Sequence, residues 1–329
     1  AWPGPPRRMA EVRRPKVAVV GGSGYTGREL LDRLARHREV EVAWASSRSE
    51  AGGPTPIPGV AFTERTQADL QGLDVVFLCL PHGAAVSWAT AARAAGVRVI
   101  DLTADHRPGS GREDGVVYGM AEHAGESLAD APMVANPGCY PTGVILALAP
   151  LLAADMIDTA RTVVVSAASG VTGAGRSPKR ELLFAEVHGD YRAYGLGNGH
   201  RHLKEMRARL PGASLLFVPH LLPVPRGILE TIALPIRADV RADGVIAVWR
   251  EAYRDSPSVS IAVAGAPTLS EVTGSDRLVL FATDNPGLEP PTLTVVVALD
   301  NLGKGAAGQA IQNLNLMLGF SAGEGLRCP

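Results

Sequence analysis

Short apolar runs rich in β-branched residues alternate with helical patterns along the first half of the chain. The runs at Lys16–Val20, Asp74–Leu80 and Val97–Asp101 are apolar at almost every position, which is typical of parallel strands buried on both faces. Helical patterns stand between them, at 28–37 and 84–95. This alternation predicts an α/β fold with a doubly wound parallel sheet.

The second half has more strand-like segments and fewer helices. Alternating strand-like segments occur within Leu215–Ile236, and further strands are expected at 278–282 and at 292–299. They predict an α+β domain with a mixed or antiparallel sheet, one face of which commonly packs on helices or on a partner subunit.

The chain has 329 residues, too many for one ordinary core. We therefore expect one domain from 16–138 together with 301–329, and a second from 139–300. The Pro- and Arg-rich stretch 1–15 is expected to be disordered or an extension outside the fold, since it lacks the apolar core of a secretory signal.

Composition narrows the possible partners. A formal net charge of −1 gives no electrostatic reason to expect nucleic acid or an acidic membrane as a partner. The longest apolar run, Val144–Ala154, is too short to span a membrane. Three widely spaced cysteines argue against a disulfide framework and favour a reducing, cytoplasmic location.

A glycine turn follows the first strand and precedes the first helix. Its glycines fit G-x-G-x-x-G or the looser G-x-x-G-x-x-G, and in either register they let a dinucleotide pyrophosphate approach the helix N-terminus. A purely structural turn is the alternative. The predicted cofactor contacts are Gly21, Gly22, Ser23, Gly24, Tyr25, Thr26 and Gly27.

The end of the second strand predicts which dinucleotide is bound. Enzymes that use the unphosphorylated cofactor usually carry an acidic residue there. This chain has Ser46, Ser47 and Arg48 instead, so we predict contacts to a 2′-phosphate and hence NADP(H). The alternative is that Arg48 is a solvated loop residue.

Two further strand-end loops carry candidate ligand contacts. Leu80, Pro81 and His82 follow a buried strand, where the loop should lie along the cofactor. His82 reaches the nicotinamide side or only caps the turn. Arg107 follows the next strand and is a candidate anion clamp, or else an ordinary loop charge.

Cys139 lies where an apolar strand turns into an apolar helix, after Asn136-Pro137-Gly138. Free N–H groups and the positive end of the helix dipole gather there, and both lower a thiol pKa. We therefore predict a nucleophilic thiolate. The alternative is a small buried cysteine without chemistry.

Two later stretches could complete the chemistry. A Gly/Ser/Thr-rich loop with two cations, Arg176 and Lys179, suits a phosphate or the cofactor amide. His200 and His202 follow, and one of them could be the general base and acid for Cys139. The alternatives are a pair of surface histidines without function and a metal site. No recognised ligand spacing is complete, so we predict no metal.

Taken together, these motifs resemble the N-acetyl-gamma-glutamyl-phosphate reductase family over about residues 15–321. The markers, in chain order, are Gly-Gly-Ser-Gly-Tyr-Thr-Gly27, Leu-Pro-His-Gly83, Asp-Leu-Thr-Ala-Asp105, Asn-Pro-Gly-Cys-Tyr-Pro-Thr142, Ser-Gly-Val-Thr-Gly-Ala-Gly175, His-Arg-His202, Pro-His-Leu-Leu-Pro223, Arg-Gly-Ile228 and Asp-Asn-Leu-Gly-Lys-Gly305.

The resemblance implies NADPH-dependent reduction of N-acetyl-glutamyl phosphate to the semialdehyde in arginine biosynthesis, through a Cys139 thioester and with release of phosphate. It implies an NADP-binding Rossmann domain to which the C-terminal helix returns, and a second domain with dimer or tetramer contacts. It points to His202, with His200 beside it, as the proton-transfer group. It leads us to expect further cofactor contacts at Ser169, Gly170 and Asn301, and substrate contacts at Arg107, Asn136, Lys179 and Tyr194.

Some positions depart from the family pattern. The family commonly has Phe at His106 and Pro at Lys204, and the stretch between Arg107 and Asn136 is short here. The alternatives are a reductase of carrier-bound aminoadipyl phosphate in lysine biosynthesis, a reductase of aspartyl phosphate, and a non-catalytic NADP-binding regulator. Tyr140-Pro-Thr142 favours the arginine branch.

Overall fold

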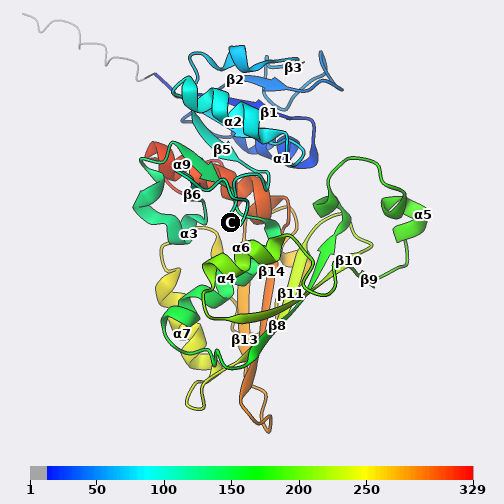
Figure 1. Ribbon diagram of the computed structural model, residues 1–329, viewed down its shortest axis with the longest axis vertical. Helices are drawn as coiled ribbons and strands as arrows, with labels where there is room; N and C mark the ends of the chain where they lie inside the picture. The colour runs from blue at the N-terminus through cyan, green and yellow to red at the C-terminus, as the bar shows by residue number, and fades with distance from the viewer. Residues whose placement is uncertain (1–12, 329) are drawn as a thin grey trace, which may run out of the picture.

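The computed structural model describes residues 13–328, and these form two seven-stranded sheets, one above the other in Figure 1. The first sheet is parallel throughout, in the order β3-β2-β1-β4-β5-β7-β6. The predicted doubly wound sheet is therefore confirmed. Its strands are β1 (Lys16–Val20), β2 (Glu41–Ser46), β3 (Phe62–Thr63), β4 (Val75–Leu78), β5 (Arg98–Asp101), β6 (Val117–Tyr118) and β7 (Met133–Ala135). Most of the stretch predicted as an extension, 1–12, lies outside the described residues.

Helices cover both faces of this sheet. On one face, Leu30, Leu31 and Leu34 of α1 (Tyr25–Leu34) are buried in one cluster with Ile311 and Leu314 of the C-terminal helix α9 (Gly308–Leu318). On the other face lies α2 (Ala85–Ala94), whose small alanine side chains pack closely on the strands. The return of α9 to the first sheet follows from its buried leucine and isoleucine side chains.

The second sheet is mixed, as predicted, in the order β12-β13-β14-β11-β8-β10-β9. Strand β8 pairs with β10 in parallel and with β11 antiparallel. The strands are β8 (Thr162–Gly170), β9 (Arg192–Ala193), β10 (Ser214–Leu222), β11 (Ile228–Pro235), β12 (Val259–Ile261), β13 (Leu278–Thr283) and β14 (Thr292–Leu299).

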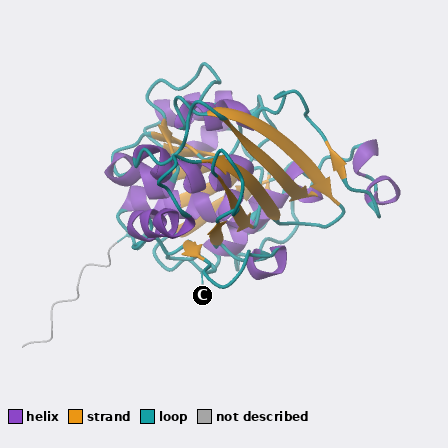
Figure 2. Ribbon diagram, turned by 90° about the horizontal axis from the view of Figure 1, so that it is seen from below, coloured by secondary structure: helices purple, strands orange, loops and turns teal. Residues whose placement is uncertain are grey.

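One face of the second sheet is covered by α4 (Cys139–Ala153), α6 (His202–Arg209) and α7 (Ala242–Ala252). Trp249 of α7 is buried and donates its indole N–H to the Ala147 carbonyl of α4, 2.8 Å away. The other face is less covered, and Leu216 of β10 is 40% exposed there. Figure 2 views this arrangement from below.

An arm between β8 and α6 projects from the second sheet, at the right of Figure 1. It holds three short helices, η3 (Val171–Ala174), η4 (Arg180–Leu182) and α5 (Phe184–Val187), and strand β9. The other short helical elements are η1 (Gln67–Leu70), α3 (Ala121–Ala124), η2 (Gly125–Leu128), α8 (Leu269–Val272) and the π-helical turn η5 (Gly303–Ala307). No helix within residues 13–328 is long and apolar enough to cross a membrane.

Buried ion pairs join α1 to the second half of the chain. Arg33 donates to Asp276 at 2.6 Å, and both side chains are fully buried. Arg226 donates to Glu29 of α1 and to Asp300, each at 2.7 Å. Paired and hydrogen-bonded in this way, these charges fix α1 against the loop before β13 and against the loops that follow β10 and β14.

Candidate active site

Cys139 is the first residue of α4. Strand β7 ends at Ala135, and Gly138 is the residue before the helix, with φ −72° and ψ 157°. The predicted strand–turn–helix placement of the cysteine is therefore correct. The chain passes close to its neighbours here, because a Cβ on Gly138 would lie 2.7 Å from Nε2 of His202.

A buried carboxylate holds the turn before Cys139 in place through hydrogen bonds. Glu205 of α6 accepts hydrogen bonds from the Gly138 N–H and the Tyr118 hydroxyl, both at 3.0 Å, and from Arg107 at 3.3 Å. These bonds hold the start of α4 in place. They also satisfy one of the free N–H groups of the turn, so the turn is ordered before any ligand binds.

The two histidines lie together beside Cys139. Their ring centroids are 4.8 Å apart, and Tyr140 packs edge-on against both rings. His200 Nδ1 accepts the backbone N–H of His202 at 3.2 Å, whereas the buried Nδ1 of His202 has no partner among the described residues. The ring of His202 is therefore oriented with Nε2 toward the turn that carries Cys139.

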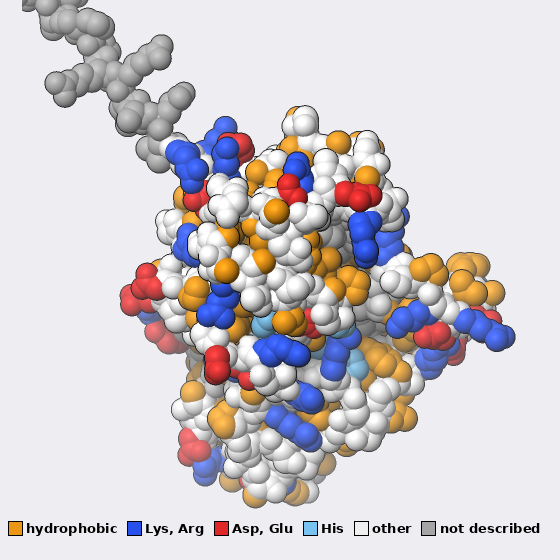
Figure 3. Space-filling view, turned by 45° about the horizontal axis from the view of Figure 1, so that its top comes forward, with side chains coloured by type: hydrophobic (Ala, Val, Ile, Leu, Met, Phe, Trp, Pro, Cys, Tyr) orange, Lys and Arg blue, Asp and Glu red, His pale blue; other side chains and the backbone are white. Residues whose placement is uncertain are grey.

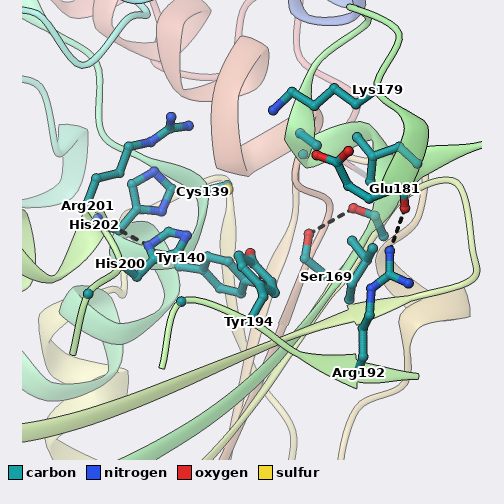
Figure 4. A pocket seen from close by; sticks show the side chains of 17 residues that line it. Cys139, Tyr140, Ser169, Lys179, Glu181, Arg192, Tyr194, His200, Arg201 and His202 are labelled. Carbon is teal, nitrogen blue, oxygen red and sulfur yellow. Dashed lines mark hydrogen bonds between the residues drawn. The ribbon is translucent and has the colours of Figure 1, made fainter. Parts of the chain in front are cut away.

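Two cavities meet at this point. One, of about 470 Å³, lies under the arm, and Figure 4 shows its labelled side chains. The other, of about 410 Å³, runs along the glycine turn and the β4 loop. The residues that line both are Cys139, Gly173, Ala174, Lys179, Arg201 and His202. A group bound in either cavity can therefore approach the sulfur.

Burial controls the protonation of the site. It raises the pKa of the Cys139 thiol to about 11, although Arg107 and the helix N–H groups act in the opposite direction. This reverses the expectation from sequence, because desolvation outweighs the helix terminus. Burial also lowers the pKa of His202 well below its usual value and that of His200 to about 4. Both rings are therefore neutral at pH 7.

The glycine turn is built to hold a dinucleotide. A Cβ on Gly27 would lie 2.6 Å from the Gly21 carbonyl, and one on Gly21 would lie 2.4 Å from the Cys79 carbonyl. These two glycines, with Gly22, permit close packing behind the turn. Gly24 faces open space and lines the second cavity together with Tyr25, Thr26 and Gly27. The free N–H groups of α1 fit a pyrophosphate there.

Other predicted cofactor residues divide between the cavities. Leu80, Pro81, His82 and Asn301 line the cavity with the glycine turn. Ser169 and Gly170 line the cavity under the arm instead. The structure therefore places these two residues in the cavity that does not contain the glycine turn.

The end of β2 lies next to the glycine turn. The Gly21 N–H donates to the Ser46 hydroxyl at 3.2 Å, and the Ser47 hydroxyl donates to that of Ser23 at 2.8 Å. Ser46, the last residue of β2, and Ser47 are both buried, whereas Arg48 is exposed. The hydroxyls predicted for a 2′-phosphate thus already contact the turn.

The predicted substrate residues do not all reach a cavity. Lys179 lines both, and Tyr194 lines the one under the arm, where it donates to Tyr140 at 3.2 Å. Asn136 is buried, and its amide bonds Ala306 and Asn313 instead. The structure does not bring Asn136 to the cavities.

Arg107 lines the second cavity, but its guanidinium already has protein partners. Its nitrogens donate to the carbonyls of Asn136 and Leu102 and to Glu205. The expected anion clamp is therefore a buried brace between the β5 loop and the Cys139 turn.

Arg201 is the cation that sequence reasoning missed. It lies between the two histidines, lines both cavities, and makes no hydrogen bond or ion pair with any described side chain or carbonyl. Figure 4 shows it beside His202 at one end of the cavity, with Lys179 at the other. Its position inside His-Arg-His202 was the available signal.

Lys and Arg side chains gather around the hollow in which histidines are visible, as Figure 3 shows. Between residues 13 and 328 no group of three or more His, Cys, Asp or Glu side chains is arranged to hold a metal ion. The arrangement offers a thiol, a neutral imidazole and unpaired cations, which suit acyl transfer from an anionic substrate.

Comparisons with known proteins agree with this arrangement. The family described as semialdehyde dehydrogenase, NAD binding domain matches residues 16–131, and the semialdehyde dehydrogenase dimerisation domain matches residues 139–301. Aspartate semialdehyde dehydrogenase II from Vibrio cholerae, solved as a complex with ASA, shares the fold with a TM-score of 0.78 at 20% identity, over 93% of this chain and 98% of that one.

Closer relatives in sequence carry one name. The N-acetyl-gamma-glutamyl-phosphate reductase of Bordetella avium is 41% identical, over 97% of this chain and 98% of its own length. That of Desulfotalea psychrophila is 38% identical, over 94% and 97%. The chain therefore belongs to the N-acetyl-gamma-glutamyl-phosphate reductase family of the semialdehyde dehydrogenases.

Proposed function

We propose that this chain reduces N-acetyl-gamma-glutamyl phosphate to N-acetylglutamate semialdehyde with release of phosphate, a step of arginine biosynthesis. The observation that carries the proposal is that Cys139 and His202 form part of the wall between two cavities, one of which contains the glycine turn. The acyl phosphate and the dinucleotide can then reach the same sulfur from different sides.

Cys139 and His202 carry out the proposed steps of the reaction. The Cys139 sulfur attacks the acyl carbonyl while the neutral His202 imidazole takes the thiol proton, and inorganic phosphate leaves as a thioester forms. A reduced nicotinamide dinucleotide supplies the hydride for the thioester carbonyl. The resulting thiohemiacetal then expels the Cys139 sulfur, which regains its proton from His202 as the aldehyde is released.

Charge stabilisation comes from the neighbours of Cys139. The first free N–H groups of α4 are suited to stabilise the carbonyl oxygen as it gains negative charge. Lys179 and Arg201, which line both cavities, are suited to the departing phosphate. Tyr194 and Ser169, in the cavity under the arm, are suited to polar groups on the rest of the substrate.

We further propose NADP(H) as the cofactor. Ser46, Ser47 and Arg48 at the end of β2 support this choice, because two hydroxyls and a guanidinium suit a 2′-phosphate. The family description gives only an NAD-binding domain. A cytoplasmic location is proposed because all three cysteines are free thiols.

We propose a homodimer or homotetramer as the working form. Support comes from the dimerisation-domain description of residues 139–301 and from exposed apolar side chains on the arm. The largest exposures are Phe184 at 78%, Leu196 at 63%, Tyr191 at 56% and Leu183 at 52%. Light scattering should give a multiple of the chain mass; a monomer at micromolar concentration would contradict the proposal.

The deciding experiment runs the reaction backwards. N-Acetylglutamate semialdehyde should reduce NADP only when inorganic phosphate is present, and faster than aspartate or aminoadipate semialdehyde. Cys139→Ser should bind NADPH yet lose this activity, and Cys328→Ser should keep it. A wild-type chain that binds nucleotide without turnover, and whose Cys139 is unreactive, would indicate the non-catalytic regulator instead.

A further inference from the structure

A cluster of charges connects the arm to the glycine turn. Arg176 of the arm donates to the Ser23 carbonyl at 2.7 Å and to one carboxylate oxygen of Glu50 at 2.5 Å. Arg28 of α1 donates to the same carbonyl at 3.2 Å and pairs with the other oxygen of Glu50. Each carboxylate oxygen of Glu50 thus has its own guanidinium.

This cluster lies where a dinucleotide fold reads the adenosine ribose. Glu50 follows the end of β2, and its N–H donates to the Ser47 hydroxyl at 3.1 Å. That hydroxyl in turn contacts Ser23 of the glycine turn at 2.8 Å. The ribose of a dinucleotide, whose pyrophosphate binds at the turn, is bound next to this strand end.

The charges are accessible and unbalanced. The side chains of Arg28 and Arg176 are 43% and 47% exposed, and that of Glu50 is 25% exposed. Two positive groups therefore face one negative group. A phosphate monoester carries about −1.5 to −2 at pH 7 and offers three acceptor oxygens, so it matches two guanidinium forks better than a single carboxylate does.

We propose that Arg28 and Arg176 grip the 2′-phosphate of NADP(H), and that Glu50 is the counter-ion from which they are exchanged. This rests on the proposed use of NADP(H) and extends it, because Arg176 comes from the second domain. The phosphate then ties the arm to the glycine turn. NAD(H), which lacks the phosphate, leaves both guanidiniums on Glu50 and gains nothing from them.

The opposing possibility is physical and specific. An acidic residue at the end of the second strand commonly accepts the ribose hydroxyls of NAD. If Glu50 did this, its replacement would weaken NADH binding, and Arg176 would be irrelevant to the phosphate. The two possibilities therefore predict different effects of Glu50→Gln: stronger binding of NADPH in the first case and weaker binding of NADH in the second.

The test measures equilibrium dissociation constants of NADPH and NADH by nucleotide fluorescence, without substrate. Arg176→Met and Arg28→Met should each weaken NADPH binding about tenfold, the usual effect of losing a charge-assisted contact, and leave NADH binding within about twofold. Arg176→Lys, which keeps the charge but loses the planar fork, should fall between. Glu50→Gln should strengthen NADPH binding about threefold and leave NADH binding within about twofold.

A matched control lies in the same arm. Arg180 is exposed and lines neither cavity, so Arg180→Met should leave both constants unchanged. As a second readout, the ³¹P resonance of bound NADP should show a 2′-phosphate that stays dianionic to lower pH in the wild type than in Arg176→Met.

The proposal is overturned if Arg176→Met weakens NADPH and NADH equally, or if Glu50→Gln weakens NADH alone. Because these measurements need no acyl substrate, they fail or succeed independently of the reductase assay. A chain that reduces NADP with phosphate yet shows no effect of Arg176→Met would keep the proposed function and lose this inference.

Discussion

The Cys139 thiol is partly exposed and the His202 imidazole is buried, and desolvation shifts their pKa values in opposite directions. Each group is consequently uncharged at pH 7. These pKa shifts do not favour an ion pair of thiolate and imidazolium formed in advance. In the proposed reaction the proton moves from sulfur to imidazole as the carbonyl is attacked, which is general-base catalysis.

Alkylation of Cys139 should therefore depend steeply on pH. With a pKa of about 11, the thiolate fraction rises about tenfold for each pH unit below that value. The rate of iodoacetamide labelling at Cys139, followed by peptide mass spectrometry between about pH 7 and pH 10, should rise accordingly. A rate that is already constant by about pH 8 would show that the helix N-terminus outweighs desolvation.

Replacement of His202 should affect the rate far more than folding. His202→Asn removes the proton acceptor, and the loss of a general base costs roughly 10²–10⁴ in kcat. His200→Asn should cost much less, since His200 accepts only a backbone N–H of its neighbour. Steady-state kinetics decide between them, with thermal melts as a check on folding. A larger loss at His200 would exchange the two roles.

The buried carboxyl of Glu230, in β11, should make the free energy of unfolding depend on pH. Its carboxyl is fully buried, neither oxygen has a partner among the described residues, and burial raises its pKa well above the usual value. The native state keeps this proton while the unfolded state loses it above about pH 4.5. Stability is therefore lost as pH rises toward the folded-state pKa, by about 1.4 kcal/mol per unit.

Glu230→Gln removes this titration but keeps the shape. In urea unfolding, the free energy of the variant relative to the wild type should rise between about pH 5 and pH 7. A difference that does not change with pH would mean that Glu230 titrates normally in the folded chain.

Individual site residues were predictable only where the chemistry is local. Cys139 follows from its own neighbours, since Pro137, Gly138 and the apolar run after them fix a turn and a helix start. Arg107 could not be judged in this way, because the carboxylate that engages it, Glu205, lies far away in sequence. We propose Arg201 for the anion-binding role predicted for Arg107, because it lines both cavities and its lack of a partner among the described residues appears only in three dimensions.

At the scale of elements, two glycines of the glycine turn serve different purposes: one allows close backbone packing and the other faces the cofactor cavity. A Cβ on Gly27 would meet only backbone atoms, within 2.6–2.8 Å, whereas the nearest atom to one on Gly24 is 3.7 Å away. Gly27→Ala must therefore move the turn, and we expect a loss of about 1–3 kcal/mol in unfolding free energy.

Gly24→Ala should leave the melting temperature nearly unchanged but weaken NADPH binding, because Gly24 faces the cofactor cavity. Calorimetry and nucleotide titration distinguish the two effects. Equal destabilisation by both substitutions would contradict the division of roles between these glycines.

The regular elements were predictable because each carries its own pattern. The buried strands of the first sheet are continuous apolar runs, whereas β11 alternates between buried and more exposed positions. The arm carries no such pattern. Its short helices and β9 depend on contacts with β10 and with the glycine turn, so neither their form nor the position of Arg176 could be derived from local sequence. The exact division of the chain into domains stays a prediction.

At the scale of the molecule, buried charge connects the two halves. Removal of Asp276 would leave Arg33 with only Glu29 as a partner in a site without solvent. Asp276→Ala should therefore cost about 3 kcal/mol of unfolding free energy, since one charge of a buried pair stays uncompensated.

Chemical unfolding measured by fluorescence and circular dichroism should show this loss. Glu251→Ala, which breaks an exposed pair with Arg254, is the matched control and should leave the unfolding curve unchanged. Equal unfolding curves for Asp276→Ala and the wild type would show that the pair of Arg33 and Asp276 contributes nothing measurable to stability.

The meeting of two cavities at Cys139 has a consequence for the order in which reactants bind and products leave. In the proposed reaction a dinucleotide binds along the glycine turn and an acyl phosphate binds under the arm, in two different cavities. Neither then has to depart before the other arrives. Spent nucleotide can be exchanged while an acyl group stays attached to sulfur.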